Sequence, residues 1–407
     1  AHAIRALGPA VALVCVSSAL RGFGQGLGDM LPTAAGQITE SAGKLVIGLA
    51  LCLVLLNRNA PSALCAAGAI GGVTAGAALG LLVTAYLTSR RCTLPEARDV
   101  PPSRRETLRQ LLAVGVPITV GAAGMSLITL LDQALVTDTL RNTLGYSAAE
   151  TSALYGQYTF GMTLFQLPPS FIYPVSVSLM PAITAALTRQ DRRAAGRAVG
   201  AALKLTTLAA LPAGVGLSVL AEPILLLLYP AVPDTARAAA YHLTFLGLAC
   251  VFVCLMVATN GVLQAYGRPY IPVFTLLCGG VMKIVTNYLM VGDPATGIRG
   301  AAVSTLYCYA LIVVLNLLAI ARYVPERPGY IGLFAKPLLL TAVMALAARS
   351  SYGLLVRCLP ERWAVLPAIL IAAAVYILLA LATGTVTRQE LLTLPKGEKI
   401  AQILGLR

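Results

Sequence analysis

Charged residues are scarce in this sequence, and their scarcity excludes a soluble globular protein. Only 11% of the 407 residues are charged and 58% are hydrophobic, well outside the usual soluble mixture. Histidine is nearly absent: neither His2 nor His242 has an acidic or cysteine neighbour at metal-site or triad spacing. The nine cysteines include no CxxC pair, and no glycine-rich nucleotide loop follows a strand. We therefore expect no enzyme, no metal site and no cofactor.

Long apolar runs take the place of these features. The mean hydropathy is +0.81, and eleven segments are long enough to cross a hydrocarbon layer of about 30 Å as helices. They lie at residues 6–24, 33–56, 63–87, 108–136, 152–186, 198–229, 239–266, 270–291, 297–321, 332–355 and 363–383. The sequence therefore predicts an all-α polytopic membrane protein with 11 transmembrane helices.

The net charge of +14 orients the protein rather than marking a nucleic-acid face. With residues 88–107 placed in the cytoplasm, and residues near span ends counted with the adjoining side, nineteen Lys and Arg are cytoplasmic and eight are outside. The other three, Lys44, Lys204 and Lys283, lie within spans. This is the positive-inside distribution. One outer segment, residues 349–362, departs from it, because it carries Arg349, Arg357 and Arg362.

An internal repeat appears when the chain is shifted by 239 residues. VCVSSALRGFGQGLGD (14–29) then aligns with VCLMVATNGVLQAYGR (253–268), and Lys44 aligns with Lys283. The first span aligns with the seventh, so the repeat unit is six helices and both copies have the same orientation, a known transporter plan. Chance similarity between two membrane hairpins is the alternative.

The repeat predicts two pseudo-symmetric six-helix lobes followed by two C-terminal helices. Residues 1–90 would be the second half of the N-lobe, 91–107 a basic cytoplasmic linker, 108–325 the C-lobe, and 326–407 the two extra helices and a tail. The chain starts without Met and its first copy has three helices, so we expect three more helices ahead of residue 1.

Lys44 and Lys283 are the first candidates for a site, because a charge at the centre of a span costs about 2.5–3.5 kcal/mol on insertion scales. In one interpretation they face a shared polar cavity between the lobes and bind an anion. In the other, each lysine is neutralised locally or reaches an interface. Glu40, four residues before Lys44, is placed for a helical ion pair, whereas Lys283 has only Asn287 within a turn.

Three further features concern a possible coupling residue, a helix break and helix packing. Asp132 is either an ion-coupling or proton site or an interfacial residue. The prolines of FQLPPSFIYPVSVSLMP (165–181) predict an interrupted helix. Gly68, Gly72, Gly76 and Gly80 recur every four residues, a small-residue stripe that lets another helix pack closely.

Several motifs resemble a known family. RGFGQGLGDMLPTAAGQITESAGKLV (21–46), VGVPITVGAAG with LITLLDQALV (114–136), LYGQYTF (154–160), SLMPAITAAL (178–187), LQAYGRPYIPV (263–273) and MKIVTNYLMVGDPATGIRGAAVST (282–305) are similar to the stage V sporulation protein B and polysaccharide biosynthesis proteins. These belong to the multidrug/oligosaccharidyl-lipid/polysaccharide exporter superfamily, which includes the MurJ-type lipid II flippases. The resemblance covers nearly the whole chain.

The resemblance implies a plasma-membrane flippase that moves undecaprenyl-pyrophosphate-linked glycans by alternating access. It implies two C-terminal helices that form a groove for the lipid tail, and a cell-wall polymerase as a possible partner. Arg21, Glu40, Lys44, Lys283 and Asn287 become candidates for the substrate cavity, and Asp132 for ion coupling. The resemblance would place residue 1 after the arginine-bearing first two helices of MurJ-like proteins. A cation-coupled multidrug antiporter of the same superfamily, a membrane scaffold and an intramembrane enzyme are the alternatives.

Overall fold

The computed structural model describes residues 2–27, 29, 31–91, 103–325 and 329–385. All regular secondary structure in these residues is helical, as expected for spans that must satisfy their backbone hydrogen bonds within one segment of a lipid-embedded chain. The chain divides into two compact units, unit 1 (Ala1–Ser103) and unit 2 (Arg104–Arg407). Each is described by itself below.

Unit 1 is a three-helix assembly. Its helices are α1 (His2–Gly26), α2 (Leu31–Asn57) and α3 (Ser62–Arg91). The third helix packs along both of the others, whereas α1 and α2 barely touch. At one end of the unit, Asp29 accepts hydrogen bonds from the Leu31 N–H and the Arg91 guanidinium, each at 2.9 Å. These two bonds tie the start of α2 to the end of α3.

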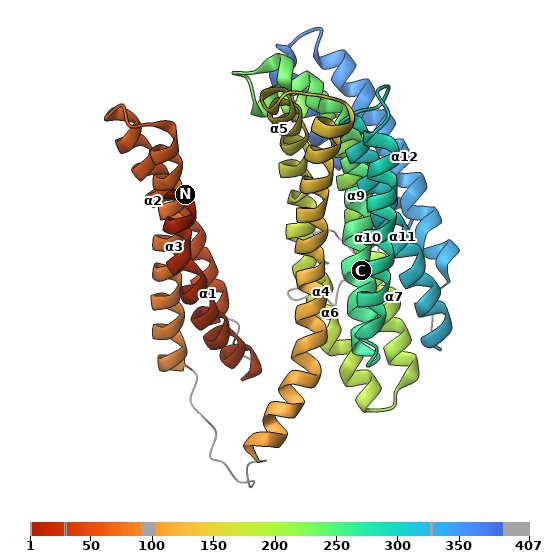
Figure 1. Ribbon diagram of the computed structural model, residues 1–407. Coiled ribbons are helices and arrows are strands. Elements are labelled where there is room, and N and C mark those ends of the chain that lie inside the picture. The colour runs from red at the N-terminus through yellow and green to blue at the C-terminus, as the bar shows by residue number, and fades with distance from the viewer. Residues whose placement is uncertain (1, 28, 30, 92–102, 326–328, 386–407) are drawn as a thin grey trace. The chain divides into compact units, whose positions relative to one another are not determined.

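Unit 2 is built around one buried helix. Its elements are α4 (Arg104–Asp138), a short π-helical turn (Thr139–Thr143), α5 (Ala148–Phe165), α6 (Leu167–Thr188), α7 (Arg192–Val219), α8 (Ala221–Leu228), α9 (Pro233–Ala265), α10 (Tyr270–Val291), α11 (Arg299–Tyr323), α12 (Tyr330–Leu355) and α13 (Glu361–Ala382). The central helix α9 packs against α5, α6, α7, α8 and α11 (Figure 1). Its most apolar window is 78% buried, so α9 forms the core of the unit.

Two of the predicted spans are each divided into two helices. Residues 152–186 break at Gln166, where Pro168 and Pro169 open α6, so the proline-rich stretch interrupts the helix as predicted. Residues 198–229 break at Leu220, between α7 and the eight-residue helix α8. Pro212, in contrast, lies inside an unbroken α7.

Nine of the helices in the described residues are long and apolar enough to cross a membrane: α1, α2, α3, α7 and α9 to α13. The protein is therefore a multi-pass membrane protein. The search covers only residues that the structure describes, and the exact total of eleven spans stays a prediction.

The packing order repeats along the chain. In unit 1, α3 packs on α1 and α2; in unit 2, α11 packs on α9 and α10, which hardly touch each other. These are the two helix triplets that the 239-residue repeat aligns. The arrangement of the triplets in two six-helix lobes stays a prediction.

Candidate functional site

Three charged side chains form the unit 1 charge cluster: Arg21, Glu40 and Lys44. Glu40 is its centre, because one carboxylate oxygen accepts a hydrogen bond from Arg21 Nη2 at 2.7 Å and the other lies 2.7 Å from Lys44 Nζ. The contact between Glu40 and Lys44 is the helical ion pair predicted from their spacing, and Arg21 reaches the same carboxylate from α1. One carboxylate faces two cations, so the cluster keeps one positive charge in excess.

That excess charge lies deep in the span and is partly accessible. Lys44 is at the midpoint of α2 (Leu31–Asn57), about 20 Å from either end at 1.5 Å per residue. Its side chain is 38% exposed, against 14% for Arg21 and 12% for Glu40. Within the described part of the chain, the buried Nε of Arg21 has no hydrogen-bond partner. The Lys44 ammonium is therefore the donor of this cluster that an anion could reach.

Glycines of α3 hold the cluster in place. A Cβ atom on Gly76 would lie 2.6 Å from both the Glu40 carbonyl oxygen and the Lys44 nitrogen, and one on Gly80 would lie 2.7 Å from Glu40 Cβ. The absence of these side chains lets α3 pack directly on the backbone that carries both charges. The prediction that the glycine stripe serves helix packing is confirmed.

Asp132 and Lys283 form the centre of a second group, the unit 2 charge cluster, together with Tyr158, Asn287 and Thr305. Lys283 Nζ lies 3.2 Å from Asp132 Oδ2 and donates to Thr305 Oγ1 at 2.7 Å. Asp132 also accepts from the Asn287 amide at 2.7 Å and from the Tyr158 hydroxyl at 3.1 Å. Helices α4, α5, α10 and α11 thus meet at one neutral ion pair.

The unit 2 charge cluster is enclosed. Lys283 is 5% exposed and Asp132 3% exposed, and Asn287, Tyr158 and Thr305 are also buried. The Ser304 hydroxyl donates to the Asn287 carbonyl oxygen, which fixes the orientation of the amide that faces Asp132. A buried pair with further hydrogen bonds of this kind offsets the cost of removing both charges from water.

This geometry corrects the expectation that Lys283 faces an open cavity. Its ammonium is sealed inside unit 2 and neutralised there, because Asp132 approaches from α4. Asp132 is likewise an internal partner in this structure rather than an interfacial residue. A role for either residue in substrate binding or ion coupling stays a prediction, and it requires the pair to open.

Two members of the cluster, Tyr158 and Thr305, and the neighbouring Ser304 were missed by residue spacing. Tyr158, Ser304 and Thr305 carry no charge, and nothing in their local sequence marks them. Tyr158 does lie in the family-like motif LYGQYTF, and Ser304 and Thr305 close the motif at 282–305. The family-like motifs therefore include these residues, although the spacing of charged residues does not point to them. In the described residues, no group of three or more His, Cys, Asp or Glu side chains could hold a metal ion.

Comparison with known families assigns the fold. The family model for the lipid II flippase MurJ matches residues 45–385, most of the chain. The chain belongs to the MurJ family. This MurJ family chain is 28% identical to the membrane protein YabM of Bacillus subtilis strain 168, over 95% of the chain and 73% of YabM. It is 24% identical to stage V sporulation protein B of the same organism over 80% of the chain, and 22% identical to lipid II flippase MurJ over 79%. It spans 62% and 60% of those two relatives.

Solved structures show the same fold at low identity. A MATE transporter in complex with MaL6 superposes with a TM-score of 0.64 at 17% identity, covering 80% of this chain and 70% of the transporter. The lipid II flippase MurJ in an inward closed conformation gives 0.63 at 16%, covering 91% and 71%. Family membership and fold place this MurJ family chain among transporters of the plasma membrane, not among enzymes.

Proposed function

We propose that this protein is a flippase that moves undecaprenyl-pyrophosphate-linked saccharides across the plasma membrane by alternating access. Membership of the MurJ family supports a flippase for lipid-linked precursors. The observation that carries the substrate class is the unit 1 charge cluster, where a partly exposed lysine keeps an excess positive charge at the midpoint of an apolar helix.

The transported lipid would carry a charged pyrophosphate group. Moving this group through a layer of hydrocarbon is costly unless charged hydrogen-bond donors replace its water. The half-buried ammonium of Lys44 is a donor of this kind, and charge-assisted hydrogen bonds to phosphate are about twice as strong as neutral ones. Glu40 holds both cations in place and offsets one of their two positive charges. The weaker net attraction would let the lipid be released.

The unit 2 charge cluster fits a role in the conformational change. Because Lys283 neutralises Asp132, the cluster adds no net charge along the path of an anionic lipid. Four helices meet at this pair, and a proton or a cation that replaced the lysine at Asp132 would change how α4 and α10 are held together. We therefore retain Asp132 as the ion-coupling candidate, with Lys283 and Asn287 as its partners.

A cation-coupled multidrug antiporter is the competing function, since the MATE and MurJ folds superpose equally well on this chain. An antiporter of cations needs accessible carboxylates. Glu40 and Asp132 are each paired with a lysine, and only the cation of the first pair is exposed. The additional α12 and α13 helices, which pack on α7 and α8, also match the flippase plan.

The test is binding of undecaprenyl-pyrophosphate disaccharide to the detergent-solubilised protein, measured by native mass spectrometry. We expect Lys44→Ala to weaken binding about tenfold, the effect of losing one charge-assisted hydrogen bond. Lys336→Ala, which removes an exposed lysine from α12, is the matched control and should bind as the wild type does. Equal binding by the wild type and Lys44→Ala would contradict the assigned site.

A further inference from the structure

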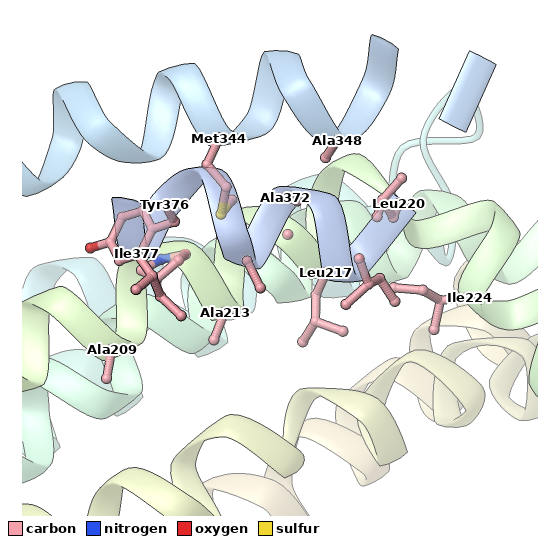
Figure 2. Close-up of a pocket in the computed structure, with 14 residues that line it drawn as sticks. Ala209, Ala213, Leu217, Leu220, Ile224, Met344, Ala348, Ala372, Tyr376 and Ile377 are labelled. Carbon is pink, nitrogen blue, oxygen red and sulfur yellow. The ribbon is translucent and has the colours of Figure 1, made fainter. Parts of the chain in front are cut away.

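Two cavities adjoin at the junction of α7 and α8, and neither is lined by a residue of the two charge clusters. The first is an apolar groove of about 380 Å³ between α7, α12 and α13, shown in Figure 2. The second is a polar pocket of about 630 Å³ lined by Glu222, Tyr241, Arg349 and Tyr352, among others. Leu220 lines both. An apolar groove that continues into a polar pocket has the shape of a binding site for an amphiphile.

The length of the groove fits a short hydrocarbon chain. Along α7 it runs from Ala209 to Leu220, about 16 Å at 1.5 Å per residue. This is close to one leaflet, half of a hydrocarbon layer of about 30 Å. The deep end is closed by Tyr376, whose hydroxyl donates to the Leu208 carbonyl oxygen at 2.9 Å. The groove therefore fits one acyl chain of a phospholipid better than a long polyprenyl chain, which the family resemblance would place there.

The polar pocket carries both charges of a zwitterionic headgroup. Arg349 makes no hydrogen bond or ion pair with any residue that the structure describes, so its guanidinium is available for a phosphate. Glu222 lies on the same pocket, and its one ion-pair contact, with Arg237 at 3.7 Å, is long and exposed. Its carboxylate can accept from an ammonium and disfavours a headgroup that is only anionic.

The position of Arg349 also needs an explanation. It belongs to the segment at 349–362 that departs from the positive-inside distribution, and topology gives these arginines no advantage on the outer side. Of the three arginines there, Arg349 is the one that lines the pocket. A phosphate ligand in the outer leaflet accounts for it.

We propose that the groove and the pocket together bind one outer-leaflet phospholipid of the phosphatidylethanolamine type. One acyl chain lies between α7, α12 and α13, the phosphate pairs with Arg349, and the ammonium pairs with Glu222. This lipid is a resident ligand of unit 2, distinct from the transported lipid at the unit 1 charge cluster.

The test compares lipids and variants by native mass spectrometry of the full chain, using phosphatidylethanolamine, phosphatidylglycerol and undecaprenyl phosphate as probes. The wild type should prefer phosphatidylethanolamine to phosphatidylglycerol. Arg349→Gln should weaken phosphatidylethanolamine binding about tenfold, with Arg357→Gln, at the same end but outside the pocket, as its control. Glu222→Gln should abolish the preference between the two phospholipids.

A third variant tests the groove. Gly216 lines the groove and a Cβ atom on it meets nothing within 4 Å, so the side chain of Gly216→Leu occupies the groove and should displace the acyl chain. Gly332→Leu, equally unobstructed on α12, is its control. Equal phosphatidylethanolamine binding by Arg349→Gln and Arg357→Gln would overturn the proposal. Binding of undecaprenyl phosphate that is lost in Gly216→Leu, without phosphatidylethanolamine binding, would overturn it too and would assign the groove to the carrier lipid.

Discussion

The ammonium of Lys283 lies 3.2 Å from the carboxylate of Asp132, and both side chains are buried within unit 2. The two residues come from α10 and α4, which no local sequence pattern connects. Each charge is stabilised by the other, because neither would be tolerated alone at this depth. The pair therefore joins two helices that would have to separate if α4 moved relative to α10.

Removing one partner should be far more harmful than removing both. We expect Lys283→Met to lower the free energy of unfolding by about 3–5 kcal/mol, because it leaves Asp132 buried and unpaired. Asp132→Asn should have a similar effect by stranding the lysine. The double variant should regain most of the lost stability, since a neutral, well-packed pair avoids the cost of an isolated buried charge. Unfolding in detergent, followed by circular dichroism, measures all three.

Lys336→Met, which removes an exposed lysine near the start of α12, is the control, and it should leave the unfolding free energy within about 0.5 kcal/mol of the wild type. Additive losses in the double variant, with no recovery, would show that the two charges do not interact in the folded protein.

The sequence could predict those parts of the site that are local. Glu40 and Lys44 lie one turn apart, so their ion pair follows from helical geometry alone, and the glycine stripe of α3 similarly predicts close helix packing. The all-helical membrane fold follows from the length of the apolar runs. These features depend on the spacing of residues within one helix or two neighbouring helices, and this spacing can be read from the sequence.

Features that depend on distant helices could not be predicted. The sequence shows Lys283 without a carboxylate in its own helix, which suggests an open cavity, but Asp132 completes the pair from a helix far away in the chain. The break at Leu220, in contrast, had a local signal, because Glu222 and Pro223 interrupt the apolar segment 198–229 and indicate a reoriented end. Hydropathy does not distinguish a segment buried in lipid from one buried in protein. It also does not show where a helix ends inside the apolar layer.

The approach of α3 to α2 provides a second prediction. Gly76→Ala should destabilise unit 1 by about 1–3 kcal/mol, the usual cost of overpacking, because its Cβ atom would lie 2.6 Å from backbone atoms of Glu40 and Lys44. Gly71→Ala is the matched control on the same helix: its Cβ atom would meet only Leu51 Cδ1, at 3.7 Å. Equal melting temperatures for the two variants would contradict the close contact.

The balance of charge in the unit 1 charge cluster provides a third prediction. Glu40→Gln leaves Arg21 and Lys44 without their carboxylate, so we expect tighter binding of undecaprenyl-pyrophosphate lipid and slower dissociation. Binding and release kinetics on immobilised protein would show this as a dissociation rate several-fold below that of the wild type. Weaker binding by Glu40→Gln would instead mean that the carboxylate contacts the ligand or that the cations need it for their position.

The ion pair between Asp29 and Arg91 provides a pH-dependent prediction. Hydrogen bonds from the Arg91 guanidinium and the Leu31 N–H hold the pKa of Asp29 below its ordinary value of 3.8. A lowered pKa in the folded state means that the carboxylate stabilises unit 1 at neutral pH and that this contribution is lost as the pH falls below 3.8. Asp29→Asn should therefore lower the melting temperature at pH 7, and the difference from the wild type should shrink on acidification. A difference that stays constant with pH would contradict this.

The central claim is that lipid-linked saccharide crosses the membrane through this protein with the help of Lys44. The most direct measurement reconstitutes the protein in liposomes with fluorescent undecaprenyl-pyrophosphate disaccharide and follows the fraction of lipid protected from an external quencher over time. We predict transfer between leaflets well above protein-free vesicles, reduced about tenfold by Lys44→Ala and unchanged by Lys336→Ala. Transfer no faster than in empty vesicles, or transfer that does not respond to Lys44→Ala, would contradict the account.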